Sequence, residues 1–278
     1  MPFPEIDPVL FSIGPIAIRW YGLAFLVGIL SGVMLARRYA RRYPVFGLSA
    51  RTFEDYGLWV TAGVIVGGRL GSVLLYNLEY YIQRPLEIFM LNQGGMSFHG
   101  GLAGVVLATV LFAWKNKISM LALGDIAACA APIGIFLVRV ANFINGELWG
   151  RVTEAPWGVI FPGAGPEARH PSQLYEAALE GALLFVVLIL LIRNTWVRAR
   201  AGLLSGLFLV GYGVIRFLIE YTREPDADLI LGLTRGQFYS LPMLVLGLVF
   251  VWRSLSGASR RPLGSARQDE GDGARQAV

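Results

Sequence analysis

Charged side chains recur inside otherwise apolar stretches of this 278-residue chain, toward the same end of each stretch. An ionised residue in hydrocarbon costs roughly 2.5–3.5 kcal/mol on insertion scales, so such residues usually serve a site. Guanidinium groups bind phosphate in a bidentate way, and histidine accepts a proton near neutral pH. The set comprises Arg19, Arg69, His99, Arg139, Glu176, Glu180, Arg216 and Glu220. We therefore expect an arginine-rich polar cavity for anionic chemistry, open toward one leaflet of a membrane.

The run from Arg139 to Arg151 is the most unusual polar stretch of the chain. Arg139 and Asn142 are three residues apart and share a helix face, where the arginine suits phosphate recognition. Asn142 and Asn145 can bind hydroxyl or carbonyl groups. A structural pair of Arg139 with Glu147 is the alternative, but such a pair would leave the surrounding polar run unexplained.

His99 stands at the start of an apolar stretch, directly before Gly100 and Gly101. Ser97 is a candidate N-cap for a helix that begins there. The alternative for His99 is a histidine that hydrogen-bonds two helices together. Its place in the arginine-rich layer favours general-base chemistry instead.

Carboxylates are spaced to balance these arginines. Gln173, Glu176 and Glu180 fall on one face of a helix that starts near Ser172, and we interpret the two glutamates as mainly structural. Arg216 and Glu220 are four residues apart and are expected to pair.

Two further charges lie outside this pattern. Arg223 follows the same apolar stretch as Glu220 and is expected to be free to meet a ligand. Asp125 lies at the other end of its stretch and is expected to cap that helix.

The elements that must position these residues are membrane-spanning helices. The chain is 55% hydrophobic and 15% charged, whereas a soluble domain has about 25% charged residues. Apolar runs of about 20 residues are long enough to cross a bilayer. They fall near residues 16–36, 57–76, 97–114, 121–142, 174–192, 202–220 and 239–253. We expect an all-α polytopic membrane protein with seven transmembrane helices in one domain, residues 1–253.

Two segments are expected to lie outside the helices. A loop region of about 143–171 is rich in glycine and proline, while Trp149, Trp157 and Phe161 in it fit an interfacial aromatic belt. Residues 254–278 are Ser-, Gly- and Arg-rich and are expected to form a disordered tail.

Orientation follows from the lysines and arginines between the apolar stretches. Fifteen lie on one side and five on the other, which predicts an outside N-terminus and a cytoplasmic C-terminus. This asymmetry accounts for most of the net charge of +5, so no nucleic-acid partner is needed. Glycines four residues apart, at Gly63, Gly67 and Gly71, favour close helix packing.

Other chemistries find little support. Two histidines and one cysteine make no zinc-type ligand set, and Cys129 is interpreted as a small core residue. Neither a metal nor another cofactor is expected. A lipid or anion transporter would also place polar residues toward the inner side, where only Asp125 stands, and a non-catalytic scaffold would not need His99 beside paired glycines.

Three motifs resemble those of bacterial prolipoprotein diacylglyceryl transferases, and the resemblance runs from about Phe11 to Trp252. They are the run from Arg139 through Asn142 to Glu147, the triplet His99-Gly100-Gly101, and the run from Arg169 to Gln173. Val138 departs from the family, which usually has glycine before the arginine.

The resemblance implies a seven-helix enzyme of the bacterial inner membrane with its site facing the periplasm. Such an enzyme moves the diacylglyceryl group of phosphatidylglycerol to the lipobox cysteine in the signal peptide of a preprolipoprotein, releasing glycerol 1-phosphate. The resemblance also implies site residues: His99, Arg223 and Tyr21 for catalysis, and Arg139, Asn142 and Gly150 for binding phosphatidylglycerol.

Overall fold

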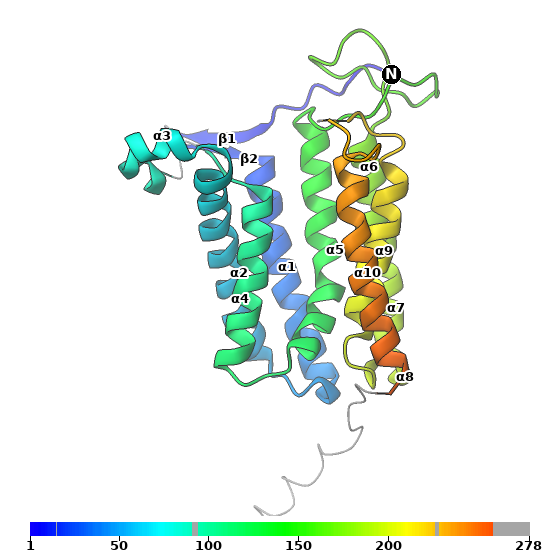
Figure 1. Ribbon diagram of the computed structural model, residues 1–278. Helices are drawn as coiled ribbons and strands as arrows, with labels where there is room; N and C mark the ends of the chain where they lie inside the picture. The colour runs from blue at the N-terminus through cyan, green and yellow to red at the C-terminus, as the bar shows by residue number, and fades with distance from the viewer. Residues whose placement is uncertain (15, 91–93, 226–227, 258–278) are drawn as a thin grey trace, which may run out of the picture.

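The computed structural model describes residues 1–14, 16–90, 94–225 and 228–257. Its long helices run side by side in one bundle (Figure 1). The long uninterrupted helices are α1 (Trp20–Arg42), α2 (Ala50–Gly71), α4 (Phe98–Lys115), α5 (Met120–Ile144), α9 (Leu203–Ile219) and α10 (Arg235–Leu255). The N-terminus lies at the end that we call the upper end, and α10 finishes at the opposite, lower end (Figure 1).

Two helical segments contain π-helical turns. The π-helix η2 (Ser72–Tyr76) prolongs α2, and α6 (Ser172–Glu176), η5 (Ala177–Leu183) and α7 (Leu184–Ile192) form one continuous helical segment. π-Helical turns are rare and often occur at functional sites. Each of the seven expected apolar segments therefore contains a helix.

Membrane character follows from length and composition. Among the described residues, five helical segments are long and apolar enough to cross a membrane: 20–42, 50–76, 120–144, 172–192 and 235–255. The helices His99–Lys115 and Leu203–Ile219 are apolar but shorter. The chain is thus a mostly helical, multi-pass membrane protein.

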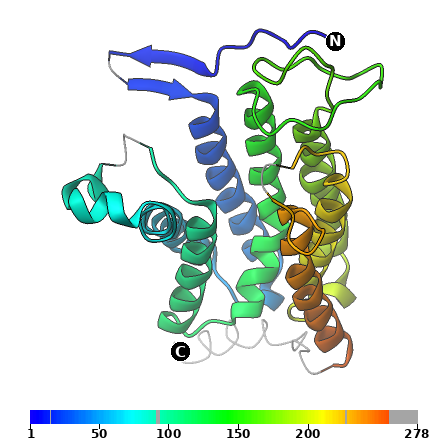
Figure 2. The same ribbon diagram turned by 45° about the horizontal axis from the view of Figure 1, so that its top comes forward.

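The prediction of an all-α fold that starts its first span at residue 16 needs one correction. Strands β1 (Val9–Ile13) and β2 (Ile16–Arg19) form an antiparallel hairpin before α1. Figure 2 shows this hairpin reaching out from the top of α1. β-Branched isoleucines favour strands, and Gly14 adopts a φ of 58° where the chain reverses.

Short elements and caps complete the helical part. The short elements are η1 (Pro44–Phe46), α3 (Leu78–Gln83), η3 (Pro85–Phe89) and α8 (Thr195–Arg198). Side-chain oxygens cap the first turns of α2, α5 and α10, where Ser49, Ser119 and Thr234 accept backbone N–H bonds at 3.2 Å.

Glycines bring α2 and α4 into backbone contact, as their spacing predicts. A Cβ atom added at Gly67 would lie 2.8 Å from Cα of Gly104, and one added at Gly63 would lie 2.6 Å from the carbonyl oxygen of Gly104. Both distances are shorter than real Cβ contacts, so larger residues would push the helices apart.

The apolar core lies in the lower half of the bundle. Its fully buried members include these side chains of α2, α5, α7 and α9: Phe53, Leu123, Ile126, Cys129, Leu188 and Leu204. Cys129 packs among them, which confirms its interpretation as a core residue.

The loop between α5 and α6 is folded against the upper end. Phe161 is 1% exposed and packs on Phe3 and Phe143, with ring centroids 5.4 and 5.8 Å apart. The aromatic-belt prediction is therefore wrong for Phe161, because the N-terminal segment covers it. The predicted disordered tail lies, from residue 258 on, outside the described residues.

Candidate active site

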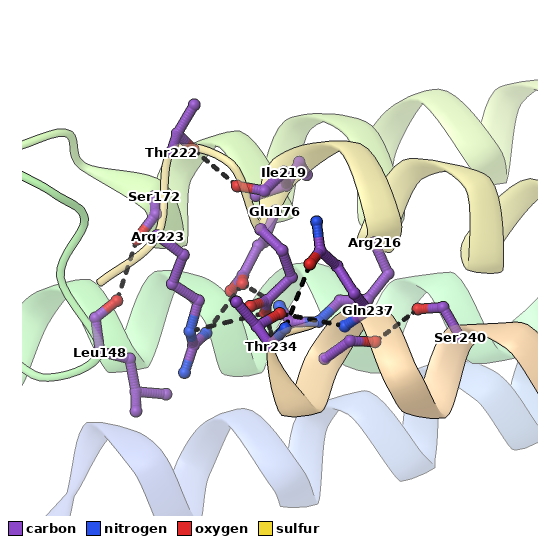
Figure 3. Close-up of polar contacts among 12 residues, drawn as sticks. Leu148, Ser172, Glu176, Arg216, Ile219, Thr222, Arg223, Thr234, Gln237 and Ser240 are labelled. Carbon is purple, nitrogen blue, oxygen red and sulfur yellow. Dashed lines mark hydrogen bonds and ion pairs between the residues drawn. The ribbon is translucent and has the colours of Figure 1, made fainter. Parts of the chain in front are cut away.

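A network of three arginines and three glutamates lies at the upper end of the bundle, and Figure 3 shows three of its members, Glu176, Arg216 and Arg223. The side chains come from α5, from the α6–η5 segment, and from α9 with the turn that follows it: Arg139, Glu176, Glu180, Arg216, Glu220 and Arg223. We call this group the ion network.

Glu176 is the centre of the ion network and is completely buried. Its Oε1 accepts from Arg223 Nη1 at 2.9 Å and from Arg216 Nη1, and its Oε2 lies 3.1 Å from Arg139 Nε. A buried carboxylate is tolerated only when charge partners and hydrogen bonds compensate for its lost hydration. Three guanidinium groups do so here.

The other two glutamates of the ion network, Glu180 and Glu220, are also paired with arginines. Arg216 also bonds Glu220, which confirms the predicted pair. Glu180, in the π-helix η5, lies 3.6 Å from Arg139 Nη2 and 3.8 Å from Arg216 Nη1. The three positive and three negative formal charges cancel, which agrees with the interpretation of the glutamates as an internal balance.

The alternative pairing of Arg139 with Glu147 is replaced by a different arrangement. Glu147 Oε1 accepts from Asn142 Nδ2 at 2.8 Å and from Asn145 Nδ2 at 3.1 Å. Because Asn142 stands one turn beyond Arg139 on α5, the polar run of the sequence forms the rim of the ion network.

The expectation that Arg223 is free to meet a ligand is wrong. Arg223 is 5% exposed and bonded to Glu176. An antiparallel bridge joins it to Gly150, and its carbonyl oxygen accepts from Arg151 Nε at 2.9 Å. The segment after α9 is thus folded back onto the bundle by contacts far away in the sequence.

Gly150 makes this close approach possible. A Cβ atom there would lie 2.5 Å from the carbonyl oxygen of Thr222 and 2.6 Å from that of His170. Any other residue would push apart the two segments that carry Arg223 and the start of α6.

Arg139 is the most accessible arginine of the ion network. Its side chain is 18% exposed, compared with 14% for Arg216 and 6% for Arg223. The ion pairs of Arg139 use Nε and Nη2, and none of the described ion pairs uses Nη1. Among the three arginines, Arg139 is therefore the one that solvent reaches most readily.

Two buried amide oxygens lack hydrogen-bond partners among the described residues: Oδ1 of Asn142 and Oε1 of Gln173. Their amide nitrogens are fixed, because both donate to Glu147, one to its side chain and the other to its backbone carbonyl. Buried unsatisfied acceptors are rare and suggest a ligand or water. Gln173 was not predicted as a site residue, although its spacing from Glu176 places it on the same helix face.

The close contact of Gly236 with the ion network was also not predicted from the sequence. This glycine lies in the first turn of α10 against the Glu220 side chain, and a Cβ atom there would be 2.8 Å from Cγ of Glu220. The turn begins with a capping box in which Thr234 Oγ1 accepts from Gln237 N at 3.2 Å (Figure 3). The sequence around Gly236 does not indicate this contact, because Glu220 lies at the end of a different helix.

His99 lies in a different part of the upper end, on α4. Ser97 caps this helix as predicted, accepting from Gly100 N at 3.1 Å. His99 Nδ1 is 3.0 Å from the Tyr76 hydroxyl, and its ring packs edge-on against Tyr239 of α10 at 5.4 Å. The histidine is exposed and contacts both α10 and the end of α2–η2.

Tyr21 lies in the first turn of α1, where it interacts electrostatically with Glu147 and Arg139. Its ring packs against Phe25 at 5.1 Å and is 38% exposed. The structure therefore places Tyr21, Asn142 and Gly150 around the ion network.

Two charges of the expected layer have structural roles. Arg69 donates to backbone carbonyls of Glu87, Ile88, Met90, Gly94 and Gly95, so it anchors the loop after α3. Asp125 does not cap its own helix: it accepts from Gly202 N at 2.8 Å and Ser205 N at 2.9 Å and caps α9. Both are buried where only tertiary partners can satisfy them.

No group of three His, Cys, Asp or Glu side chains within the described ranges is placed to hold a metal ion. The fold and the ion network together define a class: integral membrane proteins with an arginine-rich polar site at one end of a helical bundle.

Comparison with known proteins narrows this class. The sequence profile described as prolipoprotein diacylglyceryl transferase matches residues 8–253, and the chain belongs to that family. Phosphatidylglycerol–prolipoprotein diacylglyceryl transferase of Rhodopseudomonas palustris is 52% identical over 268 residues, covering 92% of this chain and 93% of that protein. The same-named protein of Pseudoalteromonas translucida is 49% identical over 254 residues, covering 90% and 94%. The chain is therefore a transferase.

Proposed function

We propose that this chain transfers the sn-1,2-diacylglyceryl group of phosphatidylglycerol to the lipobox cysteine of a preprolipoprotein, with release of glycerol 1-phosphate and without a cofactor. The observation that carries the proposal is the ion network, which is buried at one end of a membrane-spanning bundle and accessible through Arg139. It fits the phosphate of a lipid headgroup at the membrane surface.

The site faces the periplasm in a seven-span topology across the bacterial inner membrane. The N-terminus and the end of α10 lie at opposite ends of the bundle, as an odd number of crossings requires (Figure 1). Most lysines and arginines between the helices follow α1, α4 and α7 at the lower end, which supports a cytoplasmic lower end. The loop between α5 and α6 is then periplasmic.

Arg139 binds the phosphate of phosphatidylglycerol. The headgroup phosphodiester approaches Nη1 of Arg139 while Glu176 and Glu180 hold the guanidinium in place. Arg223 lies behind it and stabilises the charge that develops on the leaving phosphate. Because the glutamates already neutralise the arginines, the ion network binds the phosphate moderately and releases the product.

Asn142 and Gln173 recognise the glycerol of the headgroup. Their buried acceptor oxygens are suited to hydroxyl donors. Gly150 contributes by positioning Arg223 rather than by touching the lipid, and Tyr21 closes the side of the site near Arg139.

His99 accepts the proton of the lipobox thiol. The thiolate sulfur then bonds to the carbon of the diacylglyceryl group that carries the phosphate. The bond between this carbon and the phosphate oxygen breaks, and glycerol 1-phosphate leaves. If His99 Nδ1–H donates to Tyr76, then Nε2 is the proton acceptor, which is the tautomer that the base needs.

The deciding experiment is a transfer assay with labelled phosphatidylglycerol and a lipobox peptide. The parent should label the peptide, and Arg139→Lys, which keeps the charge but loses the planar fork, should lose at least 100-fold in rate while staying folded. Glu54→Gln, in an exposed lower-end pair, is the matched control and should keep its rate. Lipid movement across sealed vesicles without peptide labelling would instead identify a transporter.

A second comparison tests the base. His99→Gln should fail at thiol attack more than at lipid binding. A peptide analogue whose thiol is already deprotonated should react faster with this variant than the ordinary peptide does. Equal rates for the two peptides would contradict the role of His99.

A further inference from the structure

A groove runs along α1 beside α5 at the lower end of the bundle, with a cavity volume of about 800 Å³. Its upper part is apolar and its lower part is basic. The residues used below are Met34, Leu35, Ile133, Arg38, Arg41 and Arg42. We call this the α1 groove.

The α1 groove has an excess of positive charge. Neighbouring Arg37 is paired with Glu54 at 2.8 Å, and the described ion pairs provide no carboxylate for Arg38, Arg41 or Arg42. Arg42 lies over the Tyr43 ring at 5.9 Å, and Arg198, from another element, lies over the same ring at 4.3 Å. Arginines from two parts of the chain therefore converge beside the groove.

Helix geometry orders the groove from apolar to basic. Leu35, Arg38 and Arg42 follow one another at intervals of three and four residues, so they line one face of α1. An acyl chain can lie along Met34 and Leu35 while a phosphate reaches the arginines below. Basic pockets between transmembrane helices on the cytoplasmic side are suited to anionic lipid headgroups.

The α1 groove is separate from the transfer site. Arg38 and Tyr21 are both on α1, and the rise of an α-helix places them about 25 Å apart along its axis. One lipid cannot contact Arg38 with its phosphate and reach Arg139 with the same group.

We propose that the α1 groove binds an anionic phospholipid of the leaflet opposite the transfer site, as a bound lipid that is not the substrate. The proposal rests on the proposed topology, in which the lower end faces the cytoplasm. Its role is to fix the lower end of α1 against α5.

Native mass spectrometry of the full chain, released from nanodiscs with and without anionic phospholipid, tests this. The parent should retain one more anionic lipid than the variant Arg38→Gln/Arg41→Gln/Arg42→Gln, whose affinity should fall at least ten-fold. The control Arg51→Gln/Arg193→Gln/Arg253→Gln removes three exposed lower-end arginines outside the groove and should retain the lipid.

Three results would overturn the proposal. Equal lipid loss in the control would indicate general attraction to an anionic surface. Displacement of the lipid by millimolar inorganic phosphate would indicate a simple anion site. A dimer that separates in the groove variant would indicate a second copy as the occupant. Failure of the proposed transfer function is distinguishable, because the peptide-labelling assay reads only the upper end.

Discussion

The two ends of the bundle are held together by opposite means. The lower half packs buried apolar side chains such as Leu123, Leu188 and Leu204. The upper half joins α5, α6, η5 and α9 through the ion network. A buried ion pair is often no more stabilising than well-packed apolar residues of the same volume. We therefore expect the apolar packing of the lower half to contribute more to the free energy of unfolding than the ion pairs of the upper half do.

The comparison also separates two parts of the upper end. The ion network is buried and cross-linked, whereas His99 is exposed at the glycine-packed contact of α2 with α4. The charged side chains of the ion network are each fixed by several partners. His99, the proposed proton acceptor, is exposed and accessible to a thiol.

The largest expected effect is that of Glu176→Gln. This change leaves the three arginines of the ion network with two carboxylates, and removing one partner of a buried pair costs about 3–5 kcal/mol. Thermal unfolding in detergent should show the loss, together with loss of transfer. Glu54→Gln, in a surface pair worth about 0–1 kcal/mol, should change neither the unfolding temperature nor the transfer rate. Equal losses in the two variants would contradict the distinction between the ends.

Leu188→Ala tests the lower end. Leu188 is fully buried in the core, and a cavity there should cost about 2–4 kcal/mol. Below the unfolding temperature, the KM for phosphatidylglycerol should stay within about two-fold of the parent value, because the site lies at the other end. A large rise in KM would show that the two ends are coupled.

Gly67→Ala tests the contact that carries His99. The added methyl meets backbone atoms of Gly100 and Gly104, so α2 and α4 must separate, at a cost of about 1–3 kcal/mol. Transfer should fall because His99 moves relative to Tyr76. Gly134→Ala meets nothing within 4 Å, so it should be neutral or slightly stabilising, and similar behaviour of the two variants would argue against a tight contact.

The smallest expected effect concerns pH. Burial lowers the pKa of His170, in the loop before α6, below the usual value of 6.5. The unfolded chain then binds this proton at higher pH than the folded chain, so stability is complete above pH 6.5 and falls as the pH drops toward the folded pKa. His170→Gln should make the melting temperature less dependent on pH between 7.5 and 5. An unchanged pH slope would contradict this.

Several features could be read directly from the sequence because they depend on local patterns. Apolar runs predicted every long helix, since a span needs about 20 apolar residues whatever its neighbours are. Ser97 was recognised as a cap and Arg216–Glu220 as a pair, because both contacts lie within one helical turn. The motif around Arg139 also led to the correct family.

Other features were decided only by tertiary structure, because their partners are far apart in the chain. Arg223 is paired rather than free, since Gly150 and Arg151 fold its segment back onto Glu176. Arg69 and Asp125 looked alike as charges within spans, yet one anchors a loop and the other caps α9. Thus the sequence by itself determined which residues must avoid lipid, and the packing of the helices determined which partner satisfies each of them.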